Sequence, residues 1–203
     1  MVALSGSQRK TDRTFIDLFV VDSDYPGKCR IIYSKDFEKH EGRLSLNRRV
    51  VFLPESRIVT CIRDIMESYD INKDVRIKAN KLDGVAASMT VSREGEIYVG
   101  LWRSNKVIVF DCDLVKLNTI TLSGIEDGGD SVEDITVMRD TLFVRTYPGF
   151  QALLYSKSGT ELTELTSKNQ TATWSIAVSS ELVFVLWYPS YTLISVYLLV
   201  CLY

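Results

Sequence analysis

The sequence of 203 residues contains a single histidine, His40, and this scarcity limits the chemistry that the chain can perform. Proton transfer near neutral pH most often uses histidine, and no GxSxG, HExxH or Gly-rich phosphate-binding motif accompanies it here. The four cysteines are widely separated, so no pair has the short spacing of a zinc ribbon or a redox motif. We therefore expect a protein that is not an enzyme and holds no cofactor or metal.

Collagen-like and disordered chains are excluded by composition. Only 4 prolines and 11 glycines are present, whereas 46% of the residues are hydrophobic and 25% are charged. These proportions are typical of a globular protein with a sizeable core. The N-terminal stretch MVALSGSQRKTDR has no apolar signal-peptide core, which predicts a cytoplasmic protein.

Residues 182–203 contain no charged side chain, and a stretch of this length could span a bilayer. The stretch also contains Pro189, Ser190 and Thr192, and its first half repeats a pattern found earlier in the chain. Two buried strands are therefore the favoured interpretation, with a membrane segment as the alternative.

Basic residues show no concentration of the kind that nucleic acid requires. The chain has 24 Lys+Arg and 26 Asp+Glu, and residues 85–203 hold 8 basic against 13 acidic residues, a net charge of -5. Binding to phosphates depends on clustered Lys and Arg. This charge distribution argues against an RNA partner.

Two stretches in the second half of the chain are copies of one pattern. Residues 135–154, ITVMRDTLFVRTYPGFQALL, align without a gap with residues 176–195, IAVSSELVFVLWYPSYTLIS, at an offset of 41. A third copy begins near Met89 and a weaker fourth near Ile58, and the runs FIDLFVV and CRIIY suggest a degenerate fifth copy in residues 1–47. Self-similarity at a fixed period of about 40 residues indicates a repeat architecture.

Each copy contains four short apolar runs separated by polar turns. In the clearest copy the runs are residues 87–92, 97–102, 107–110 and 116–122. Such runs predict short antiparallel strands, and four strands in about 40 residues form one blade of a β-propeller. The segment CIRDIMESY, residues 61–69, is predicted as strand from the repeat alignment. We predict an all-β fold of about four to five blades, each with four antiparallel strands.

The stretch MTVSREGEIYVGLWRSNKVIVFDCDLVKL, residues 89–117, resembles one repeat of the NHL family. It is also similar to a WD-repeat blade, because Phe110-Asp111 and Tyr69-Asp70 stand where that family has Trp-Asp, although the Gly-His pair of WD repeats is absent. The resemblance covers roughly residues 48–197. It implies a propeller that binds partners through its loops, and RNA is a ligand of some NHL propellers.

The predicted units are a poorly defined N-terminal segment, 1–47, and repeats at about 48–84, 85–124, 131–168 and 172–203. Propellers of the two families usually close with six or more blades, which is more than this chain supplies. We therefore expect an incomplete ring that is completed by further blades or by self-association.

In propellers of these families, the loops after the second strand and the loops between blades share one face. The repeat alignment places Arg63, Trp102, Tyr147 and Tyr188 at the end of successive second strands, with Arg103, Phe150 and Tyr191 beside them. Aromatic residues and arginine dominate binding hot spots, so these residues are the candidate partner-binding site. The same side chains could instead pack between neighbouring blades, and both interpretations stay open.

A loop between two blades is acidic and contains Glu126, Asp127 and Asp130. Carboxylates can bind Ca²⁺, but this spacing is not that of an EF-hand, so a solvated loop that attracts basic partners is the favoured interpretation. The sequence thus predicts a non-catalytic scaffold that binds a peptide or protein. The alternatives are a fragment of a metal-dependent propeller hydrolase and an RNA-binding NHL-like propeller.

Overall fold

The structure, a computed structural model, describes residues 2–8, 13–21, 29–37, 49–129, 131–148, 150–165, 172–178, 182–188 and 194–198. These residues form strands, turns and loops, and no helix occurs among them. Within the same residues, no helix is therefore long and apolar enough to cross a membrane. The predicted strands around residues 61–69 are confirmed, because β5 and β6 occupy this segment.

The strands group into five antiparallel sheets, each built from strands that follow one another in the chain. Sheet 1 contains β1 (Val2–Gln8), β2 (Arg13–Val21) and β3 (Cys29–Phe37). Sheet 2 contains β4 (Arg49–Leu53), β5 (Arg57–Ile62), β6 (Ile65–Asp70) and β7 (Val75–Lys81). Sheet 3 contains β8 (Ala86–Val91), β9 (Ile97–Leu101), β10 (Lys106–Phe110) and β11 (Lys116–Thr121). Sheet 4 contains β12 (Ser131–Met138), β13 (Thr141–Tyr147), β14 (Ala152–Ser156) and β15 (Glu161–Leu165), and sheet 5 contains β16 (Ala172–Val178), β17 (Leu182–Tyr188) and β18 (Ile194–Leu198).

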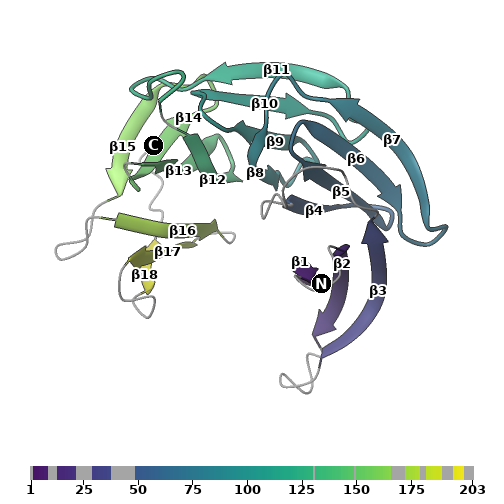
Figure 1. Cartoon of the computed structure of the whole chain (residues 1–203). Helices are drawn as coiled ribbons and strands as arrows, with labels where there is room; N and C mark the ends of the chain where they lie inside the picture. The colour runs from purple at the N-terminus through teal and green to yellow at the C-terminus, as the bar shows by residue number, and fades with distance from the viewer. Residues whose placement is uncertain are drawn as a thin grey trace.

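The five sheets follow one another around an arc (Figure 1). The first strand of each sheet lies on the inner side of the arc, and β7 and β11 lie on its outer side. Sheets 1 and 5 stand at the two ends, and the described strands do not close the arc into a ring. The prediction of an all-β fold built from propeller-like blades in an incomplete ring is confirmed, with three strands described in each of sheets 1 and 5.

The pairing register of the strands matches the sequence repeat. Ile135 pairs with Val144 in sheet 4, and Ile176 pairs with Val185 in sheet 5, which reproduces the offset of 41 at both positions. A bulge precedes each of these pairs, between Val132 and Asp134 in one sheet and between Thr173 and Ser175 in the other. Residues that align in the sequence repeat therefore occupy equivalent positions in the two sheets.

Hydrophobic side chains fill the space between neighbouring sheets. Val59 and Met66 of sheet 2 pack in one cluster with Val99 and Ile108 of sheet 3. A second cluster joins sheets 3 and 4, and a third joins sheets 4 and 5. Sheets 3 and 4 are thus covered on both faces, which explains why β9 consists entirely of buried residues.

The position of the Trp-Asp pair of WD repeats has a structural role in this chain. The third strands of sheets 2, 3 and 4 carry Tyr69, Phe110 and Tyr155 at their last or second-last position, and all three are buried. The carboxylate of Asp70 accepts hydrogen bonds from the backbone N–H groups of the next turn, and that of Asp111 does the same in sheet 3. These carboxylates therefore fix the turn into the outer strand.

A bulge recurs at one position of the outer strands. Ile77, Leu117 and Leu162 are the extra residues of β7, β11 and β15, and each is about half exposed. Bulges disturb the regular edge of a sheet and so oppose pairing with another chain. We assign this repeated feature to protection of the outer edges.

Candidate functional site

One end of sheet 3 carries both the loop between β9 and β10 and the connections to the neighbouring sheets. The backbone N–H of Trp102 donates to the carbonyl of Val85 at 2.7 Å, in the connection from sheet 2. The N–H of Arg103 donates to Ser131 Oγ at 2.8 Å, at the start of sheet 4. These loops form one surface, here called the loop face, on which the predicted site residues Trp102 and Arg103 lie, with Tyr147 beside Ser131.

Three of the predicted site residues hold the sheets together through their backbone. Arg63, Arg103 and Phe150 have positive φ values of 56°, 50° and 52°, which side-chain-bearing residues adopt only in tight turns. The carbonyl of Arg63 accepts a hydrogen bond from Ala86 at 2.7 Å, and that of Phe150 accepts one from Thr173 at 2.6 Å. In both cases the donor lies on the first strand of the next sheet, so these loops stiffen the junction between sheets.

The side chains of Trp102 and Tyr147 are about half exposed. Trp102 is 45% exposed and Tyr147 is 46% exposed. The Tyr147 ring packs edge to face against Phe150, with ring centroids 5.2 Å apart. About half of each side chain therefore lies on the surface of the protein.

Other predicted site residues lie partly or wholly outside the described part of the chain. Tyr188 ends β17, but only its backbone is described, and Tyr191 and Asp130 are not described.

The described residues of the acidic loop, Glu126 and Asp127, are exposed, and Asp127 accepts a hydrogen bond from Ser104 Oγ at 3.0 Å. Among the described residues, no group of three or more His, Cys, Asp or Glu side chains is placed to hold a metal ion.

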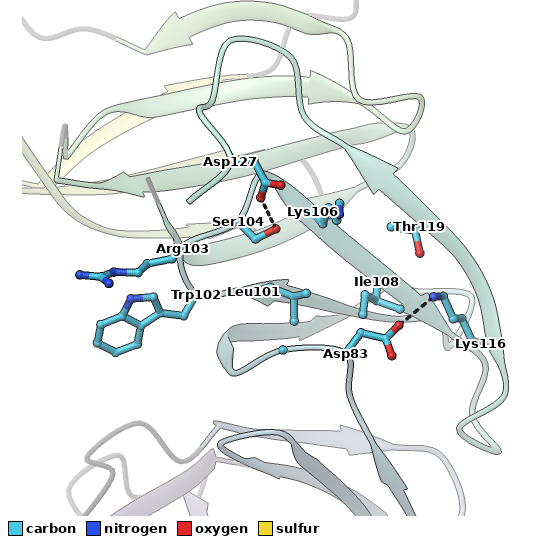
Figure 2. Close-up of a pocket in the computed structure, with 11 residues that line it drawn as sticks. Asp83, Leu101, Trp102, Arg103, Ser104, Lys106, Ile108, Lys116, Thr119 and Asp127 are labelled. Atoms are coloured by element: carbon cyan, nitrogen blue, oxygen red, sulfur yellow. Dashed lines mark hydrogen bonds and ion pairs between the residues drawn. The ribbon is translucent and has the colours of Figure 1, made fainter. Parts of the chain in front are cut away.

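A pocket of about 370 Å³ opens beside Trp102 on the loop face. Its floor is formed by Leu101 and Ile108, which belong to the hydrophobic cluster between sheets 2 and 3. Figure 2 shows Trp102 and Arg103 at one end of the pocket and an ion pair between Asp83 and Lys116 at the other. The pocket was not predicted from the sequence, because Leu101 and Ile108 fit the apolar pattern of any buried strand and give no separate signal for a pocket.

A polar cluster on the inner strands was also not predicted from the sequence. Arg49 on β4 donates from Nε to the carbonyl of Ala87 at 2.8 Å and from Nη2 to the carbonyl of Glu133 at 3.1 Å. One side chain therefore links sheets 2, 3 and 4.

Arg145 on β13 lies close to this cluster, with Nη2 3.7 Å from Glu133 Oε2. Burial lowers the pKa of Arg145, and the nearby Asp134 and Glu133 carboxylates partly offset the effect. Asp134 Oδ2 accepts hydrogen bonds from Ser175 Oγ at 2.7 Å and from the N–H of Ile176 at 3.2 Å. We interpret the cluster as structural, because its contacts connect the inner strands of successive sheets.

No protein family model and no curated protein match this chain. Solved structures do resemble it. A protein of unknown function from Bacteroides caccae superposes with a TM-score of 0.62 at 12% identity, covering 91% of this chain and 64% of that one. Sqt1 of Saccharomyces cerevisiae gives a TM-score of 0.58 at 13% identity, covering 91% of this chain and 52% of that one. The computationally designed Ika4 protein gives 0.56 at 12% identity, covering 78% and 94%.

At these identities the likeness shows the fold alone. This chain spans less than two thirds of the length of Sqt1 and of the Bacteroides caccae protein. The neighbours support the propeller-like fold, and no family match supports the NHL or WD-repeat resemblance, so both stay predictions.

Proposed function

We propose that this chain is a non-catalytic interaction module that binds a protein or peptide segment through the loop face. The observation that carries the proposal is the half-exposed pair of aromatic side chains on adjacent sheets, Trp102 in the β9–β10 loop and Tyr147 at the end of β13. Tryptophan and tyrosine are the residue types that most often dominate binding energy at interfaces.

Hydrogen bonds of the backbone connect the loop that carries Trp102 to neighbouring segments of the chain. Backbone hydrogen bonds connect Trp102 with Val85 and Arg103 with both Gly128 and Ser131. A site held in this way loses little conformational freedom when a partner binds, so more of the contact energy appears as affinity. This property suits a recognition surface.

The test is capture of partners by the wild-type chain and by the double variant Trp102→Ala/Tyr147→Ala, compared by quantitative mass spectrometry. Loss of a hot-spot side chain costs about 1–2 kcal/mol, which is roughly 5- to 30-fold in Kd for each aromatic. The matched control is Leu162→Ala, which removes a similarly exposed apolar side chain from the outer strand β15.

The proposal expects partners that the control retains and the double variant loses, while both variants keep the wild-type melting temperature. Partners that the double variant and the wild-type chain retain equally would place binding elsewhere. Unfolding of the double variant would make the aromatics structural and would remove the proposal.

A further inference from the structure

The charged side chains around the Trp102 pocket differ in whether they already have a partner. Asp83 pairs with Lys116 at 3.4 Å, and Asp127 accepts a hydrogen bond from Ser104. Within the described part of the chain, neither the guanidinium of Arg103 nor the amine of Lys106 has a partner. The acidic groups of the pocket are therefore engaged, whereas two of its cations are available to a ligand.

The repeat shows that the cation at position 106 is not required by the fold. The register places Ile65 of β6 and Gln151, just before β14, at the positions equivalent to Lys106. On the outer strand, Glu161 is the equivalent of Lys116. An apolar, an amide and an ammonium group thus occupy one structural position, so the ammonium group is specific to this pocket.

We infer that the Trp102 pocket binds an extended acidic peptide segment, with a carboxylate against Lys106 and an adjacent apolar side chain against Trp102. This inference rests on the proposed function and names the class of partner for it. Charge complementarity favours the carboxylate, because the two available groups are both cations. The apolar floor of Leu101 and Ile108 favours a ligand with a hydrophobic side chain over a small inorganic anion.

A phage-displayed library of random octapeptides tests the inference directly. The library is selected against the wild-type chain, against Lys106→Gln and against Arg93→Gln, and the selected peptides are then tested for binding to Trp102→Ala. The first variant introduces the residue type that stands at the equivalent position 151. Arg93→Gln is the matched control, since it removes one exposed positive charge from the turn between β8 and β9, at the opposite end of the same sheet.

Peptides rich in Asp or Glu next to Leu, Phe or Trp should be enriched by the wild-type chain and by Arg93→Gln. Lys106→Gln should bind these peptides about threefold to fivefold more weakly, the range expected for one exposed charge pair. Lys106→Glu should shift the selected peptides toward Lys and Arg.

Selected peptides that contain no excess of acidic residues but depend on Trp102 would overturn this inference and leave the proposed function in place. If no selected peptide depends on Trp102 for binding, the inference is wrong, and the result also counts against the proposed loop-face site. The variants keep the backbone bonds of the loop, and melting temperatures equal to that of the wild-type chain show that any loss is not due to unfolding.

Discussion

Replacing Gly100 by alanine should strain the contact between sheets 3 and 4. Gly100 lies on β9, and a Cβ at this position would stand 2.5 Å from Val132 Cγ1 and 2.9 Å from Val132 Cβ, on the first strand of the next sheet. It would also contact Ser88 Oγ, which donates a buried hydrogen bond to the carbonyl of Val132 at 2.8 Å. Because both neighbours are buried, neither can move into solvent.

The expected cost combines two effects. Inserting a methyl group into a well-packed core costs about 1–3 kcal/mol, and displacing Ser88 would weaken a hydrogen bond worth about 0.5–1.5 kcal/mol. We expect Gly100→Ala to lower the free energy of unfolding by about 2–4 kcal/mol. For a chain of this size, this corresponds to a fall in melting temperature of roughly 4–16 °C.

Urea denaturation of a double-mutant cycle with Val132→Ala separates this strain from general destabilisation. Val132→Ala removes the methyl group that faces position 100, so it should cost about 1 kcal/mol less in the Gly100→Ala background than in the wild-type chain. Gly129→Ala provides the control, because a Cβ there would only reach ordinary van der Waals contact, 3.8 Å from Glu126 Cβ. A Gly100→Ala cost below about 0.5 kcal/mol, or additive effects in the cycle, would refute the described packing of the two sheets.

Two further predictions concern titratable groups. Burial raises the pKa of the Cys61 thiol, so iodoacetamide should label the half-buried Cys112 of the native chain before Cys61. Mass spectrometry can follow the labelling, and equally fast labelling of Cys61 would contradict its burial. A hydrogen bond from the Lys73 backbone N–H is the main cause that lowers the pKa of Asp70. The ionised Asp70 therefore contributes its full stabilisation above its unfolded pKa of about 3.9. This contribution disappears as the pH falls through the lower pKa of the folded state. Asp70→Asn should therefore reduce the acid dependence of stability in urea titrations below pH 4, and an unchanged dependence would contradict this assignment.

The strands of sheets 3, 4 and 5 were predictable because each repeat alternates apolar runs with turns. The alignment of Leu142 with Val183, for example, placed residues that the structure shows at equivalent points of β13 and β17. Such local patterns record which residues must be buried, and burial is repeated from sheet to sheet.

The left-handed backbone at Arg63 and Arg103 was not predictable, because arginine carries no preference for positive φ. The contact of Arg49 with Glu133 was missed for another reason: it joins residues 84 positions apart through three sheets. The pocket did leave one sequence signal, since Lys106 departs from Ile65 and Gln151 at one repeat position. A repeat alignment emphasises the residues that the copies share. A residue that differs between copies, such as Lys106, therefore does not stand out in it.

The stacking of sheets is tested most directly by a nuclear Overhauser experiment on a methyl-labelled chain. The account predicts a cross-peak between a Val132 methyl group and the α-protons of Gly100, because the space beside Gly100 is occupied by Val132 Cγ1. It also predicts cross-peaks across the β8–β9 pairing, for example between Met89 and Val99. Cross-peaks within sheet 3 without the contact to Val132 would show that sheets 3 and 4 fold but do not stack, and would contradict the central claim.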